Sequence, residues 1–118
     1  MNCGIYCIKR YLEDHGYPSE ETCRLLEAQL EDGQLSVLTM KNALQKAGFA
    51  LRAYCDRSLS HKPDILLDHR KHHYYLYRGS DKRYVYLSDV NHGDFRVPRF
   101  LFSLLGLKYI LCIEKIML

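Results

Sequence analysis

The spacing of apolar residues changes at Phe49, and this change constrains the fold more than any other feature of the sequence. Before Phe49, apolar residues recur every three or four positions, as on the buried stripe of a helix. After it, short runs rich in tyrosine, valine and isoleucine alternate with turn residues, as in β-strands. Helices first and antiparallel strands second predict an α+β domain, with N-terminal helices packed on a C-terminal antiparallel sheet.

Three helices are predicted in the first half, each bounded by a capping residue or a glycine. The first occupies the opening dozen residues and ends before Gly16. Ser19 is expected to cap the second helix, which Gly33 ends, and the third runs from the cap Ser36 to Gly48. All three are interpreted as scaffold for the strands that follow.

The second half is predicted to form an antiparallel sheet with one short helix. Two β-rich runs joined by Gly79–Lys82 indicate a hairpin. Pro98 suits the first turn of a helix that runs through Leu105. The expected strands cover residues 49–55, 64–67, 73–78, 83–88, 95–97 and 108–113.

Length and charge restrict the class of protein. A chain of 118 residues is long enough for one domain with a core and too short for two, so we expect a single domain over 1–118. The formal charge is only +3, and the basic residues are scattered singly, which disfavours a nucleic-acid partner. No apolar stretch approaches the roughly 20 residues that a membrane-spanning helix needs.

The cysteine count indicates a reducing compartment. The five cysteines are an odd and dispersed set, and no secretory signal precedes them. Such a set is typical of free thiols and not of a disulfide framework. We therefore expect a cytoplasmic protein that does not itself span a membrane.

Cys3 is the first candidate for chemistry because it stands at the start of the first predicted helix, beside Gly4. Unpaired N–H groups and the positive end of the helix dipole favour a thiolate at that place. The glycine allows a substrate or another backbone segment to come close. The alternative is that Cys3 is an ordinary terminal thiol, frayed or packed.

A cysteine nucleophile needs a base and a group that orients the base. His73 opens one strand of the predicted hairpin and Asp89 ends the other, so the two are expected to be cross-strand neighbours. The alternative is that His73 is a solvated residue at the sheet edge and Asp89 forms a turn. The residues alone leave these two interpretations level.

A zinc site built from Cys3, Cys7, His72 and His73 is a weaker alternative. Two adjacent histidines on a strand would point to opposite faces of the sheet, which disfavours it. We predict no metal and no cofactor. The remaining four cysteines are interpreted as small core residues, and the other histidines, at positions 15, 61, 69 and 92, as solvated.

Several short motifs, in order, resemble the bacteriocin-processing cysteine peptidases, family thirty-nine of the papain-like group. Those domains occur alone or fused to peptide-exporting ABC transporters and cut leader peptides after a double glycine. The motifs that carry the resemblance are Asn2-Cys3-Gly4, residues 32–38 leading into 46–49, His73 with the aromatic and apolar residues 74–76, Leu87-Ser88-Asp89 with Gly93, and residues 100–106.

The resemblance implies a papain-like fold with Cys3 as nucleophile, His73 as general base and acid, and Asp89 as the orienting residue. Three departures from the family pattern stand out. Asn2 replaces an Asp, Val90 replaces a Pro, and the family's Gln several residues before the cysteine has no counterpart, as in a chain truncated at its N-terminus. Loss of one oxyanion donor typically costs about a hundred- to a thousandfold in rate.

Two functions are therefore expected. The first is a cysteine peptidase that cleaves a peptide leader after a double-glycine-type site with the Cys3-His73-Asp89 triad. The alternative is a catalytically impaired, peptidase-like module that binds a leader peptide for a transporter or a modifying enzyme. In both cases the partner is a peptide with a leader, and an ABC transporter is the expected larger assembly.

Overall fold

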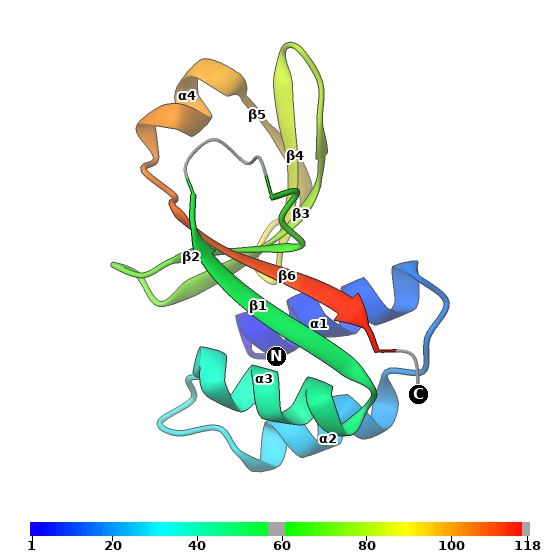
Figure 1. Ribbon diagram of the computed structural model, residues 1–118. Coiled ribbons are helices and arrows are strands. Elements are labelled where there is room, and N and C mark those ends of the chain that lie inside the picture. Colours follow the sequence, from blue (N-terminus) through cyan, green and yellow to red (C-terminus); the bar gives the residue numbers. More distant parts are fainter. Residues whose placement is uncertain (57–60, 117–118) are drawn as a thin grey trace.

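A computed structural model describes residues 1–56 and 61–116 of the chain and has four helices and six strands (Figure 1). Three helices come first and the strands follow, with one short helix before the last strand. The elements are α1 (Cys3–Asp14), α2 (Glu20–Ala28), α3 (Val37–Lys46), β1 (Phe49–Cys55), β2 (Ile65–Asp68), β3 (His73–Ser80), β4 (Tyr84–Asp89), β5 (Gly93–Pro98), α4 (Arg99–Leu104) and β6 (Tyr109–Lys115).

The six strands form one antiparallel sheet in the order β1-β6-β2-β3-β4-β5. Apolar side chains of α1, α2 and α3 bury one face, against residues such as Leu51, Ile65 and Leu76. The opposite face carries a smaller cluster around Leu66 and Leu87, which Phe102 of α4 covers. Figure 1 shows α1 to α3 together on one side and α4 apart from them. The predicted α+β arrangement is confirmed.

Helix α1 forms where the sequence predicts it. The Asn2 side chain caps its start by accepting hydrogen bonds from the N–H groups of Gly4 and Ile5. Ile5, Ile8 and Leu12 are almost fully buried and form the stripe that packs against β3. The helix therefore holds its first residue, Cys3, in a fixed place against the sheet.

Helix α2 departs from the prediction at both ends. Ser19 has a helical backbone conformation and makes no side-chain capping bond. The helix ends at Ala28, well before Gly33, so the predicted end was wrong. Gly33 is needed elsewhere, because Asp32 and Gly33 both adopt positive φ in a tight two-residue turn, with φ of 52° and 74°. That turn brings Glu31 and Gln34 into a backbone bridge.

The strands are close to their predicted positions. The first is correct to the residue, and the second begins one residue later than predicted. The hairpin turn lies later in the chain than predicted, since Gly79 and Ser80 still belong to β3 and residues 81–83 make the turn. The Asp81 side chain holds this turn by accepting from the N–H groups of Arg83 and Tyr84.

None of the helices in the described residues is both long and apolar enough to cross a membrane. The longest of them, α1, has 12 residues, of which six are buried.

Candidate active site

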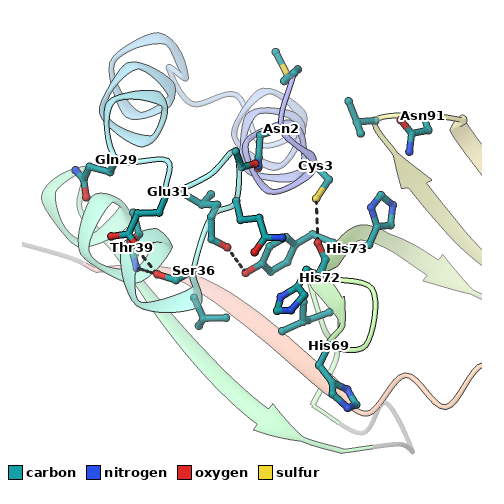
Figure 2. A pocket seen from close by; sticks show the side chains of 18 residues that line it. Asn2, Cys3, Gln29, Glu31, Ser36, Thr39, His69, His72, His73 and Asn91 are labelled. Atoms are coloured by element: carbon teal, nitrogen blue, oxygen red, sulfur yellow. Dashed lines mark hydrogen bonds between the residues drawn. The ribbon is translucent and has the colours of Figure 1, made fainter.

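A cavity of about 590 Å³ lies where the start of α1 meets the sheet. Four segments line it: residues 1–3, the stretch between α2 and the first turn of α3, the β2–β3 connection, and the two residues after Asp89. Cys3 and His73 both belong to this lining, and Figure 2 shows their side chains at the same end of the cavity. The helix start and the hairpin strands therefore meet at one site.

Cys3 is the first residue of α1 and is half-buried. Its thiol donates a weak hydrogen bond to the backbone carbonyl oxygen of His72, with an S–O distance of 3.9 Å (Figure 2). His72 lies in the turn before β3 and has a positive φ of 49°. The thiol thus lies directly beside the residue that precedes His73.

His73 and Asp89 form a hydrogen-bonded pair. The imidazole Nε2 lies 3.0 Å from Oδ2 of Asp89, and the side chains are only 18% and 3% exposed. A carboxylate can only accept, so Nε2 carries the proton, and in the neutral ring Nδ1 is then free to take one. The dyad geometry that a triad requires between its base and its orienting residue is present.

The two residues are cross-strand neighbours, as expected, and they lie on a diagonal of the strand pair. The register pairs Leu76 with Ser88, so Tyr75 lies opposite Asp89 and His73 lies two residues further along the same face. The His73 ring packs edge-on against Tyr75, with ring centroids 4.6 Å apart. The long imidazole spans the diagonal, which cross-strand neighbours of this kind can do.

The Asp89 carboxylate also forms the turn that the alternative interpretation expected of it, in addition to its bond to His73. Its Oδ1 accepts from the backbone N–H groups of Asn91 and His92, at 3.1 and 2.6 Å. Nδ1 of His92 also lies 3.0 Å from the same oxygen, while its side chain is 71% exposed, as expected of a solvated histidine. A histidine three residues after a turn-forming Asp is the signal that could have found this contact.

Burial acts to raise the pKa of Asp89, but the hydrogen bonds from His73 and His92 outweigh it and lower the pKa below its ordinary value. The carboxylate is therefore charged at neutral pH and holds the His73 ring by a charge-assisted bond.

The segment between α2 and α3, which forms one wall of the cavity, is hydrogen-bonded to the neighbours of both Cys3 and His73. The Asn2 amide donates to the carbonyl oxygen of Gly33 at 2.7 Å, and the Tyr74 hydroxyl donates to that of Leu35 at 2.7 Å. Leu35 also approaches the helix start so closely that a Cβ added at Gly4 would lie 3.0 Å from its Cδ2. The segment between α2 and α3 is thus fastened to the residues next to Cys3 and next to His73.

Comparison with known proteins decides the family. The sequence profile of the Peptidase C39 family matches residues 1–115. The chain belongs to the Peptidase C39 family. Among curated proteins, none matches the chain significantly.

Solved structures show the same papain-like peptidase fold. A double glycine motif protease from an AMS/PCAT transporter, solved with its leader peptide, superposes with a TM-score of 0.75 at 20% identity, covering 98% of this chain and 85% of its own. The peptidase domain of Streptococcus ComA, described as a bi-functional ABC transporter involved in a quorum sensing pathway, gives 0.73 at 18%, covering 98% and 92%. The N-terminal peptidase C39 like domain of a Vibrio parahaemolyticus toxin secretion ATP-binding protein gives 0.66 at 15%, covering 94% and 92%.

The zinc alternative has no geometric support in this C39-family chain. His72 lies in a turn and not on a strand, so the expectation that both histidines are on one strand was wrong and the argument from opposite faces does not apply. Within residues 1–56 and 61–116, no three side chains of His, Cys, Asp or Glu form a group that could hold a metal ion.

The other thiols differ in their surroundings. Cys7 is fully buried, as predicted, and burial raises the pKa of its thiol, with smaller contributions from the charges of Cys3 and Asp89. Cys55 was expected in the core but is exposed near the end of β1, so that prediction was wrong. Cys23 and Cys112 are half-buried, and burial raises the pKa of both.

Proposed function

We propose that this C39-family chain is a cysteine peptidase that cleaves a peptide leader after a double-glycine-type site. Cys3 is the nucleophile, His73 the general base and acid, and Asp89 the residue that orients His73. The observation that carries the proposal is the 3.0 Å bond between His73 and Asp89 in a cavity that Cys3 also lines. The active unit is a single peptidase-like domain over residues 1–118 in the cytoplasm.

The reaction is an acyl transfer. Nδ1 of His73 takes the thiol proton, and the Cys3 sulfur attacks the carbonyl carbon of the scissile peptide bond. The C–N bond then breaks as the imidazolium returns the proton to the leaving amine, leaving a thioester. A water molecule that gives its proton to His73 attacks the thioester, releases the leader as a carboxylate, and restores the thiol.

The start of α1 supplies part of the electrostatic stabilisation. The first N–H groups of a helix have no acceptor within the helix. Among the described residues, the Asn2 side chain takes those of Gly4 and Ile5, which leaves the N–H of Cys3 to donate to the oxyanion. The dipole of α1 favours negative charge at the same place.

Three further observations support the setting. The similar structures include a double glycine motif protease solved with its leader peptide and two domains of transport proteins, so the partner we propose is an ABC transporter that exports the cleaved peptide. All five cysteines are free thiols, as a reducing cytoplasm requires. The exposed Cys55 would be a liability in an oxidising compartment.

The second candidate function is a module that binds the leader without cutting it. It is supported by the weak hydrogen bond of the Cys3 thiol, which goes to the backbone carbonyl oxygen of His72. The cavity could then hold the end of a leader for a transporter or a modifying enzyme.

The test uses the full chain and a synthetic leader peptide that ends in Gly-Gly followed by several cargo residues. We expect mass spectrometry to show cleavage after the second glycine by the wild type and none by Cys3→Ala. Cys55→Ala, which removes an exposed thiol outside the cavity, is the matched control and should cleave like the wild type. Binding of the peptide by the wild type without any cleavage would replace the peptidase by the binding module.

A further inference from the structure

A ring of four polar side chains, linked by three hydrogen bonds and by the pairing of β4 with β5, joins α1 to the sheet. Nη1 of Arg10 donates to the Tyr6 hydroxyl at 2.8 Å and to Oδ1 of Asp94 at 3.2 Å. The Tyr6 hydroxyl lies 2.7 Å from Oγ of Ser88. Ser88 lies opposite Asp94 in the strand register, so the two side chains lie on the same face of the sheet. These four residues lie outside the lining of the cavity.

Arg10 fixes the direction of one of these hydrogen bonds. Arginine can only donate, so the Tyr6 hydroxyl accepts from Arg10 and keeps its own proton for a bond to Ser88. The neighbouring Ser88 hydroxyl, together with Arg10, lowers the pKa of Asp94. Asp94 therefore stays charged at neutral pH and keeps its ion pair with Arg10.

Ser88 is fully buried, so water does not replace a partner that it loses. A buried hydroxyl left without a partner costs more than the net gain of an ordinary hydrogen bond. The ring also pairs every polar side-chain atom it buries, which makes a single arrangement of α1 on the sheet favourable.

The ring lies next to the residues proposed for catalysis on both of its sides. Tyr6 is three residues after Cys3 on the same helix, and Ser88 directly precedes Asp89 on the same strand. Three residues of helix rise about 4.5 Å, and one residue of strand about 3.4 Å. A change in the seating of α1 on β4 would therefore move the Cys3 sulfur relative to the pair of His73 and Asp89.

We propose that Tyr6, held between Arg10 and Ser88, is a positioning residue that sets the distance between Cys3 and His73. The proposal rests on the proposed peptidase function, because it concerns the geometry of that site. Tyr6 touches neither the substrate nor the reacting atoms. It acts through the helix that carries Cys3 and the strand that carries Asp89.

The test compares two tyrosines of α1. Tyr6→Phe removes only the hydroxyl that reaches Ser88. Tyr11→Phe is the matched control, because Tyr11 is on the same helix and its hydroxyl donates to the carbonyl oxygen of Ile113 at 3.3 Å, away from β4. Alkylation of Cys3 by iodoacetamide is followed from mildly acidic to mildly alkaline pH, with peptide mass spectrometry to separate Cys3 from the other thiols.

We expect Tyr6→Phe to slow the alkylation of Cys3 about tenfold below neutral pH. A misplacement of 1 Å costs roughly a hundredfold in rate, and the loss of one hydroxyl should shift the helix by less than that. Tyr11→Phe should keep the wild-type pH profile while losing a similar amount of thermal stability. Ser88→Ala should reproduce the effect, and the double variant Tyr6→Phe with Ser88→Ala should add little to it. Arg10→Met, at a partly exposed site, should give a smaller change in the same direction and serves as the test if Tyr6→Phe or Ser88→Ala does not fold.

Two results overturn the positioning role alone: a wild-type pH profile in Tyr6→Phe, or an equal loss in Tyr11→Phe. A wild-type Cys3 that already alkylates like a free thiol at every pH overturns the proposed peptidase function, and the positioning role with it. The pH profile of the wild type therefore tells the two failures apart.

Discussion

Replacing Asp89 by Asn changes the proton position on His73 while keeping the shape of the side chain. The amide oxygen is expected to remain at the Oδ1 position, because two backbone N–H groups donate there. The amide NH₂ then faces Nε2 of His73, which lies 3.0 Å from the present Oδ2. Nε2 must become an acceptor, so the ring carries its proton on Nδ1, the nitrogen that should take the proton of Cys3.

The expected loss follows from this tautomer. In a serine peptidase triad the equivalent substitution lowers turnover roughly 10⁴-fold for the same reason. The fold should change much less. Three well-placed donors lose a charged acceptor, and the difference between charged and neutral hydrogen bonds is about 1 kcal/mol each, so the free energy of unfolding falls by about 3 kcal/mol at most. The bond from His92 is left out of this sum because its side chain is 71% exposed.

The assay measures kcat and KM on the Gly-Gly leader peptide together with urea unfolding. Asp64→Asn is the matched control, because the Asp64 carboxylate also accepts a backbone N–H, that of Ile113 at 2.6 Å, at the far end of β2. It should lose a comparable hydrogen bond without a large change in kcat. A folded Asp89→Asn variant with kcat within about tenfold of the wild type would refute the tautomer argument.

Three further predictions concern the surroundings of the site. Cys7 should alkylate far more slowly than Cys55 in the native protein, because Cys7 is fully buried and Cys55 is exposed; peptide mass spectrometry after a short iodoacetamide pulse measures the ratio, and comparable rates would contradict the packing of α1. The pKa of Asp89 is lower in the folded state than the roughly 3.9 of an unfolded Asp, so its contribution to stability is complete above about pH 4 and is lost as the pH falls through the folded value. Urea unfolding at acidic pH should show that the free energy of unfolding falls less steeply with pH in Asp89→Asn than in the wild type. The same pH dependence in both proteins would contradict this. Asn2→Asp keeps the helix cap but loses the donor to the Gly33 carbonyl, so thermal unfolding should show a loss of about 1 kcal/mol, and no loss would mean that this bond is not formed.

Much of the fold could be predicted because local patterns and tertiary packing agree. Ile5, Ile8 and Leu12 form one helical stripe, and all three are buried in the structure. The strand at Phe49–Cys55 was predicted to the residue because a glycine precedes it and the period of the side chains changes there. The predicted end of α2 was wrong because Gly33 does not end the helix; it forms a tight turn farther along the chain.

Of the candidate site, the hairpin topology allowed only the proximity of His73 and Asp89 to be predicted. A strand that begins at His73 and a partner that ends at Asp89 must bring these residues near each other in any antiparallel pairing. The exact pairing was not predictable, because the turn lies later than expected and Arg78 is an extra residue in a β-bulge between Tyr77 and Gly79.

The contacts of Tyr6 and His92 were missed for two different reasons. His92 contacts Asp89, three residues before it, and this local spacing could have predicted the contact. Tyr6 contacts Ser88, 82 residues later in the chain, and no local pattern indicates that pairing. The side chains of successive strand residues point to opposite faces of the sheet, which the sequence predicts. Which of the two faces α1 covers could not be predicted.

The central claim is that Cys3 and His73 act as a coupled pair, and the most direct test is the pH dependence of Cys3 alkylation in the wild type and in His73→Ala. A thiol that shares its proton with an imidazole forms a thiolate–imidazolium pair, so the wild type should alkylate fast well below about pH 8.5, where a free thiol becomes slow. His73→Ala should remove that advantage and give the profile of an ordinary thiol. An ordinary thiol profile in the wild type, unchanged in His73→Ala, would contradict the account.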